Sequence, residues 1–207
     1  MSTVVHLIDT LTEWARNNIC DCIKLKQPPK DLEAPTAEGY EYKLVTPSAF
    51  PMYVPTSEKL PPNVHAPFPS LCVRVTGGED SMTGGGRSVD VQFCFSTWDT
   101  GEHGKDRLLP DGKGGSVRWD GEEADAYFKC RGDGWRDAWN FLDLALRSIE
   151  SVDFIGGYAI DRSVPIKYGP LTEQESIPDL YPTWFAWLSF RVTCPLVRNN
   201  EDYQNLL

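Results

Sequence analysis

The chain has 207 residues, of which 41% are hydrophobic and 12% are aromatic, so one domain can bury enough apolar surface to form a core. Its formal net charge of −10 disfavours sequence-specific binding to nucleic acids, because that affinity is built largely from Lys and Arg contacts to phosphates. The first residues lack the basic and apolar regions of a signal peptide. No stretch approaches the roughly 20 apolar residues of a membrane span. We therefore expect a soluble, intracellular protein, with its six cysteines reduced.

The first predicted element is an amphipathic helix over residues 3–24. Lys24 and Lys26 lie where positive charge suits a helix C-terminus, and Pro28 with Pro29 ends the helix. The apolar residues recur at steps of three and four, which places them on one face: Val4, Leu7, Ile8, Leu11, Trp14, Ala15, Ile19 and Cys22.

Residues 28–69 contain ten of the sixteen prolines and offer only a weak alternating strand over 40–45. A segment of this length with so little regular structure is uncommon inside a compact domain. We predict that it is an extended Pro-rich arm.

Two strands follow, over 70–76 and 89–97. The second alternates apolar and polar residues, as expected for a strand with one buried face. The glycine run over 83–88 lies between them and predicts a hairpin turn. We expect Gly77 and Gly78 to lie at a turn or bulge, and Cys72, Cys94 and Cys194 to act as small apolar residues in strands.

A second long excursion covers residues 99–128, which are rich in Gly and Asp. Excursions of this kind are lids, binding loops, or arms that become ordered against another chain. The large apolar side chains within the two long segments favour docking. The five candidate contacts with other subunits or partners are Phe50, Tyr53, Phe68, Trp98 and Trp119. For the two tryptophans, local packing is an equal explanation.

A second helix is predicted over 134–148, with Asp133 as its N-cap. Its apolar stripe consists of Trp135, Ala138, Trp139, Leu142, Ala145, Leu146 and Ile149, and we expect the tryptophans of both helical stripes to be core residues.

Strands over 154–160, 164–168 and 183–194 complete the chain. The first half of the last strand is apolar on both faces, which predicts a central strand or one covered by a partner. The order of elements predicts a single α+β domain over 1–207, in which two amphipathic helices pack on a mostly antiparallel sheet and the two long segments are insertions.

Motifs that carry chemistry are not found. The glycine run lacks the Lys-Ser/Thr ending of a phosphate loop and precedes a strand. His6, His65 and His103 are far apart in sequence, and Cys20 with Cys22 does not have zinc-finger spacing. Asp133 and Asp137 are better explained as a cap and a first-turn acid than as paired catalytic carboxylates. We expect no enzyme activity, no cofactor and no metal.

The arrangement of elements resembles the tail terminator, or tail completion, proteins of long-tailed bacteriophages and phage-tail-like particles. The likeness lies in an amphipathic first helix, a strand pair that contains 89–95, a helix that opens with 134–139, and a late strand that contains 184–190. Together these pieces cover about 100 to 130 residues. The family has no short diagnostic motif.

The resemblance implies a subunit that forms a hexameric ring at the head-proximal end of the tail tube. Its partners would be other copies of itself, the tail tube protein, a neck or connector protein and, in a contractile tail, the sheath protein. Such a protein would be present in the bacterial cytoplasm during assembly and in the mature virion afterwards. An acidic ring suits a channel through which DNA passes without being bound.

Two alternatives fit the same sequence. Within phage assembly, the chain could be a neck, head–tail joining or sheath-interface protein, because these also use extended arms. From another class, it could be an enzyme or small-ligand protein whose Gly-rich loop closes over a pocket.

Overall fold

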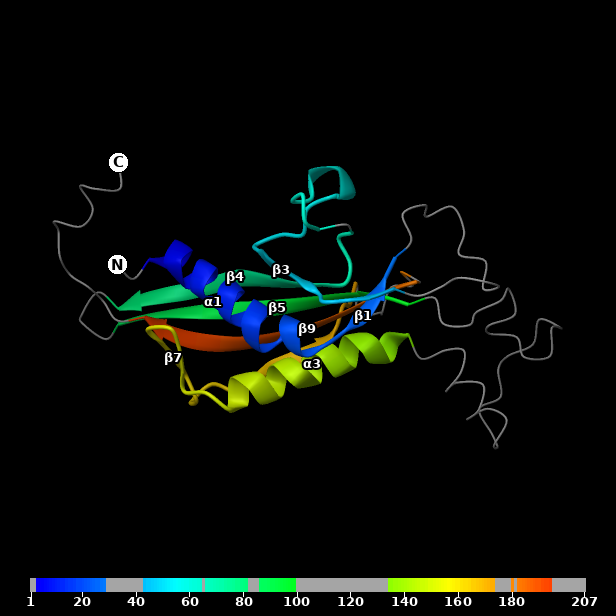
Figure 1. The fold of residues 1–207 in the computed structure, drawn as a ribbon. Helices are drawn as coiled ribbons and strands as arrows, with labels where there is room; N and C mark the ends of the chain where they lie inside the picture. The colour runs from blue at the N-terminus through cyan, green and yellow to red at the C-terminus, as the bar shows by residue number, and fades with distance from the viewer. Residues whose placement is uncertain are drawn as a thin grey trace, which may run out of the picture.

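The computed structural model describes residues 3–28, 43–64, 66–81, 86–99, 134–173, 180 and 182–194 (Figure 1). In chain order the elements are α1 (Val4–Asn18), a 3-10 turn (Cys20–Cys22), β1 (Leu25–Gln27), β2 (Lys43–Val45), β3 (Ser48–Pro51), a second 3-10 turn (Ser57–Lys59), β4 (Ser70–Ser81), β5 (Gly86–Trp98), α3 (Trp135–Glu150), β6 (Phe154–Ile155), β7 (Tyr158–Ile160), β8 (Lys167–Pro170) and β9 (Thr183–Cys194). The predicted α+β class is confirmed.

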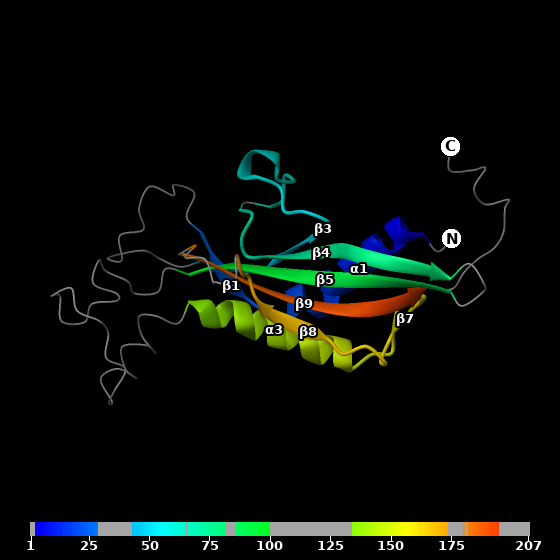
Figure 2. The same cartoon turned by 180° about the vertical axis from the view of Figure 1, so that it is seen from behind.

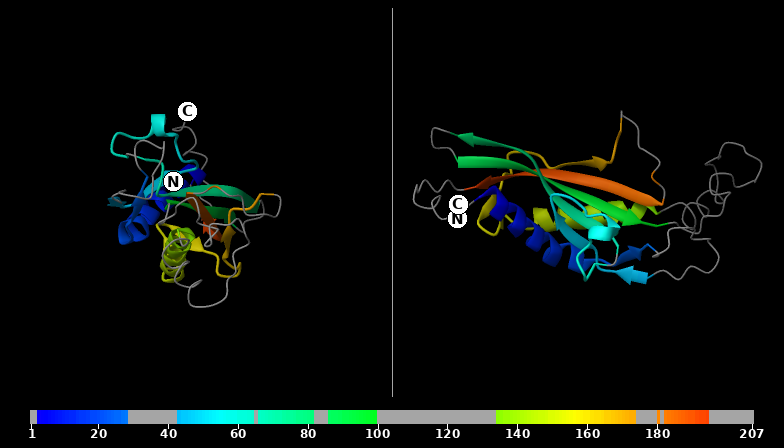
Figure 3. Two further views of the ribbon diagram at one scale, coloured as in Figure 1. Left: turned by 90° about the vertical axis from the view of Figure 1, so that its right-hand side faces the viewer. Right: turned by 90° about the horizontal axis from the view of Figure 1, so that it is seen from above.

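The main sheet has seven strands in the order β3-β4-β5-β9-β7-β6, with β8 also paired to β9. Among the strands that the structure describes, only the pair β3–β4 is parallel, so the sheet is mostly antiparallel, as predicted. The long strands β4, β5 and β9 run side by side through its middle (Figure 3). The last predicted strand is therefore central, with β5 along one edge and β7 and β8 along the other.

Both helices cover the same face of this curved sheet. α1 lies against β3 and β4, whereas α3 lies against β5 and β9 (Figure 1). Alternate residues of the strands supply the sheet side of the core, as the two-residue period of a strand requires. The fully buried side chains on this face include Leu71, Val73, Val91, Phe93, Phe95 and Leu188 from the sheet and Leu7, Leu11, Phe141 and Leu142 from the helices.

The first helix is shorter than predicted. It ends at Asn18, and the chain then forms a 3-10 turn and strand β1. β1 pairs with β2 in a separate two-stranded sheet, Leu25 opposite Val45. Lys24 and Lys26 therefore do not stabilise a helix C-terminus. The pairing of β1 with β2 replaces the helix that the apolar periodicity predicted for these residues.

The extended-arm prediction for 28–69 is not confirmed where the structure describes that range. β2 begins at Lys43, and β3 is an edge strand of the main sheet that places Phe50 in the interior. The segment between β3 and β4 then lies over the face that the helices leave open (Figure 2). There the ring of Phe68 packs edge-on against that of Phe185, with 5.9 Å between centroids. Residues 29–42 lie outside the described residues.

The bulge predicted at Gly77 and Gly78 is confirmed. The pairing of β4 with β5 shifts between Val75 and Gly77, which marks a bulge. Gly156 adopts φ +61° between β6 and β7, a conformation that favours glycine. β4 and β5 pair as far as Ser81 and Gly86, as expected for a hairpin, and the connecting residues 82–85 lie outside the described residues.

The three strand cysteines lie in β4, β5 and β9, as predicted. Cys72 stands opposite Cys94 in the β4–β5 pair. Burial raises the pKa of the Cys72 thiol to about 12 and also raises that of Cys94. These thiols therefore stay protonated at neutral pH and behave as small apolar side chains.

None of the helices in the described ranges is both long and apolar enough to span a membrane.

Candidate functional site

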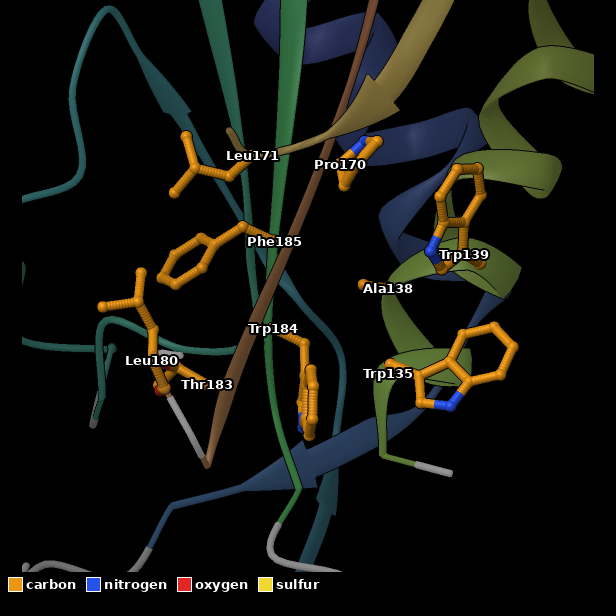
Figure 4. A pocket seen from close by; sticks show the side chains of 9 residues that line it. All are labelled: Trp135, Ala138, Trp139, Pro170, Leu171, Leu180, Thr183, Trp184 and Phe185. Carbon is orange, nitrogen blue, oxygen red and sulfur yellow. The ribbon is translucent and has the colours of Figure 1, made fainter. Parts of the chain in front are cut away.

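A pocket of about 290 Å³ lies where the start of α3 meets the end of β8 and the start of β9 (Figure 4). Three chain segments line it, and nearly every lining side chain is apolar. The lining residues are Trp135, Ala138, Trp139, Pro170, Leu171, Leu180, Thr183, Trp184 and Phe185.

Helical and strand periodicity bring these side chains together. Trp135 and Trp139 are four residues apart, so both project from the same side of α3, one turn from each other. Trp184 and Phe185 are neighbours in β9 and point to opposite faces of the sheet. In Figure 4, Phe185, Leu171 and Leu180 lie on one side of β9, and the α3 tryptophans lie on the other.

Large apolar side chains remain exposed around the pocket. Trp135, Leu171 and Leu180 keep 39%, 41% and 43% of their surface accessible. The guanidinium of Arg136 stacks over the Trp135 ring at 5.1 Å from its centroid, a cation–π contact that helps to hold the indole in place.

Lys26, Asp99, Gly134 and Trp184 form a cluster at the edge of the pocket, which we call the clasp. It holds the Trp184 side chain, which lines the pocket, in place. The indole N–H of Trp184 donates to the backbone oxygen of Asp99 at 3.1 Å. Lys26 Nζ lies 2.7 Å from Asp99 Oδ1, and the Asp99 side chain is only 7% exposed. The backbone of Gly134 packs so closely on this group that an added Cβ would lie 2.8 Å from the Asp99 oxygen.

The pocket is built to hold hydrocarbon and aromatic groups. Among the described lining residues, the only side-chain hydroxyl is that of Thr183, and it donates to the backbone oxygen of Leu180. These described residues include no carboxylate, imidazole, thiol or amine. The indole N–H of Trp184 already donates to the backbone oxygen of Asp99. Binding would therefore be driven by burial of apolar area, with tryptophan as the principal anchor surface.

A second polar group lies on the helix-free face of the sheet, away from the pocket. Arg191 of β9 forms a two-pronged ion pair with Asp90 of β5, at 2.8 and 3.1 Å. Hydrogen bonding to Asp90 and its negative charge raise the pKa of Arg191. This arrangement ties two central strands together and offers no nucleophile or general base.

The five contact residues proposed from the sequence do not form one site. Phe50 and Trp98 are buried within this chain, so for Trp98 the local-packing alternative applies. Phe68 is half-buried against Phe185, and Tyr53 is largely exposed. Trp119 lies outside the described residues. None of the four described residues lines the pocket.

The sequence interpretation missed the pocket because it assigned Trp135 to the core. Trp135 instead lies in the first turn of α3, where the helix projects past the side chains of the core cluster. One signal pointed to the site: the first half of β9 is apolar on both faces, which indicated a central or partner-covered strand. Asp133, the predicted N-cap, lies outside the described residues, and α3 begins after Gly134 without a side-chain cap.

The part of the chain that the structure describes contains no group of three or more His, Cys, Asp or Glu side chains placed to hold a metal ion. No protein-family model matches the chain, and a comparison with curated proteins also finds no match.

Proposed function

We propose that this chain is a structural assembly protein of a phage tail or a tail-like particle. In its specific form it is a terminator, which forms a hexameric ring at the head-proximal end of the tail tube and docks the tube to the neck. The ring would also contact the sheath in a contractile tail. Neck or sheath-interface protein is the alternative within the same class.

The observation that carries this proposal is the character of the pocket. Its described lining is apolar, with three tryptophans, no ionisable group and exposed leucines at the rim. Such a tryptophan-rich lining is typical of a protein-docking hot spot. A catalytic pocket instead brings together polar and titratable groups.

Two further features support assembly. The net charge of −10 suits a ring through which DNA passes, since it weakens contact with phosphates. Segments 29–42 and 100–128, which lie outside the described residues, contain both acidic and apolar residues, and we assign them to contacts with neighbouring subunits and with the tube.

The first experiment is the native mass of the purified protein at increasing concentration, combined with negative-stain imaging. Closed rings with a central hole and six subunits are the expected result. The same protein is then incubated with purified tail tubes, and binding at one tube end is scored by imaging. A monomer that also fails to bind tube ends contradicts the proposal.

A small-ligand function is the second candidate, because a pocket of about 290 Å³ lies near the lower size limit of small-molecule sites. An apolar probe that binds a strict monomer at micromolar concentration, with quenching of tryptophan fluorescence, would favour this function over assembly.

A further inference from the structure

We infer that Cys72 and Cys94 form a reversible disulfide across the β4–β5 pair when the folded protein meets a hydroperoxide. In the reduced protein the two thiols pack as small apolar side chains, and oxidation converts the same residues into a covalent link between two strands. The inference does not depend on the assembly role, because it concerns the central sheet of the fold itself.

The two cysteines are directly opposed in the sheet. Cys72 of β4 is the register partner of Cys94 of β5, and side chains at opposed positions of an antiparallel pair are close neighbours on one face. Opposed Cα atoms are about 4.5–5.5 Å apart, within the roughly 4.4–6.8 Å that a disulfide spans. Burial and, next to it, the charge of Cys94 raise the pKa of Cys72, and such coupling requires that the two sulfur atoms be close. A bond can therefore form without a change of strand register.

The pair lies on the face of the sheet that the helices leave open. The neighbours of Cys72 in β4, Leu71 and Val73, belong to the core under the helices, so Cys72 points to the opposite face by the two-residue period of a strand. Cys72 is 4% exposed there, whereas Cys94 is half-buried. Cys94 is therefore the thiol that a small oxidant reaches first, and Cys72 is the protected thiol beside it.

Two polar side chains adjoin the thiols on this face. Arg74 and Gln92 form the next opposed pair, two residues along each strand. The Cys94 thiol donates to Gln92 Oε1 at 3.5 Å. Burial raises the pKa of Cys94, while the charge and a hydrogen bond of Arg74 act in the opposite direction. Arg74 therefore favours the thiolate of Cys94, which is the form that reacts with an oxidant.

One molecule of hydrogen peroxide supplies the two-electron oxidation. The Cys94 thiolate attacks a peroxide oxygen, the O–O bond breaks, and Cys94 becomes a sulfenic acid while the leaving hydroxide is protonated to water. The Cys72 thiol then loses its proton and attacks the Cys94 sulfur, so the S–S bond forms, the S–O bond breaks and a second water leaves. Because burial keeps both thiols mostly protonated, we expect this reaction to take minutes to hours, as other uncatalysed disulfide chemistry does.

The test exposes the folded, full-length protein to hydrogen peroxide, then unfolds it in urea with N-ethylmaleimide, which blocks the remaining thiols, and digests it with trypsin. Trypsin cuts after Lys and Arg, so Cys72 falls in peptide 60–74 and Cys94 in peptide 88–105. We expect these peptides to be joined, with a mass two hydrogens below their sum, and to separate again in dithiothreitol. Cys194, which is buried in β9, is the internal control and should carry N-ethylmaleimide.

Variants separate the roles of the two thiols. In Cys72→Ser the second thiol is missing, so we expect a sulfenic acid at Cys94 that dimedone traps. In Cys94→Ser the buried Cys72 should stay unmodified over the same interval.

The role of Arg74 is tested by the rate of disulfide formation. Arg74→Gln should slow the reaction severalfold, and Arg74→Lys, which keeps a positive charge, should restore most of the rate. Arg147→Gln removes the same charge from an exposed position on α3 and should leave the rate unchanged. Thermal melting shows that each reduced variant is folded before rates are compared.

Three outcomes would overturn the inference. One is the absence of joined peptides 60–74 and 88–105 after a long incubation of the folded protein in excess peroxide. Another is a link that forms only when the oxidation is carried out in urea, because the folded sheet would then hold the sulfur atoms out of reach. The third is linkage of Cys72 and Cys94 to other cysteines as often as to each other. Equal rates in Arg74→Gln and Arg147→Gln would contradict the role of Arg74.

Discussion

Gly134 occupies a position in the clasp where no side chain fits. A Cβ at this residue would lie 2.7 Å from Trp184 Nε1 and 2.8 Å from the backbone oxygen of Asp99. We predict that Gly134→Ala lowers the free energy of unfolding by about 1–3 kcal/mol, the usual cost of overpacking, because the backbone atoms of Asp99 cannot move aside as a flexible side chain would. Urea unfolding followed by tryptophan fluorescence measures the change.

Gly157→Ala is the matched control. A Cβ there meets no atom within 4 Å, and Gly157 is not among the glycines with positive φ. The expected change is neutral, or a stabilisation of up to about 1 kcal/mol through the unfolded state. Equal destabilisation by both substitutions would show that the close packing of Gly134 on Asp99 and Trp184 is not the cause of the stability loss in Gly134→Ala.

Single residues were the hardest part of the site to predict from sequence. Exposure of Trp135 and burial of Trp98 depend on partners far away in the chain, such as Pro182, whose oxygen accepts from the Asp99 N–H. Periodicity reports which residues share a face of one element, not where that element runs past its neighbours. The apolar stripe of α3 was therefore read correctly along most of its length and wrongly at its first turn.

Among the elements, the turn after β7 has a carboxylate whose ionisation can be followed directly. Asp161 Oδ1 accepts from the Ser163 hydroxyl at 2.6 Å and from the Ser163 N–H at 2.9 Å. These hydrogen bonds lower the pKa of Asp161 below its ordinary value of 3.8. A lowered folded-state pKa contributes stability above the unfolded-state pKa, and that contribution is lost as the pH falls through the folded-state pKa.

We predict that Ser163→Ala raises the pKa of Asp161 toward its ordinary value, because the stronger of the two hydrogen bonds disappears. An NMR titration of the side-chain carboxyl carbons measures this shift. Ser163→Thr retains the hydroxyl and should retain the lowered pKa. The difference in stability between wild type and Ser163→Ala should be present at neutral pH and shrink in acid; a difference that grows in acid would contradict the assignment.

The elements that the sequence predicted well are the long ones with a clear period. Strand β9 has the predicted bounds, 183–194. Strand β5 covers 86–98, whereas the prediction gave only 89–97. β3 was missed because it has four residues, one of them proline, and its position depends on parallel pairing with β4. The end of α1 was misplaced because β1 is held by pairing with β2 across residues 28–42, which no local pattern reveals.

At the scale of the whole molecule, the clasp brings Asp99 and Gly134, the described ends of the segment between them, into contact. We predict that replacing residues 101–132 by two glycines leaves a folded protein with a melting temperature within a few degrees of wild type. The reason is that the clasp already holds the two ends together, so a shorter connection costs no extra closure entropy. Circular dichroism during heating measures the outcome. A variant that fails to fold would show that the segment contributes to the core rather than being joined to it.

The pairing of β5 with β9 also has a consequence during synthesis. Residues 87–98 of β5 pair with the whole of β9, yet β9 begins 85 positions after β5 ends, at residues 183 and 98. At about 5–20 residues per second, the ribosome needs roughly 4–17 s to cover this interval. Throughout that time one edge of β5, rich in Val and Phe, lacks its native partner. An unpaired strand edge of this kind can pair with other chains, so we expect the nascent protein to be most prone to aggregation during this interval.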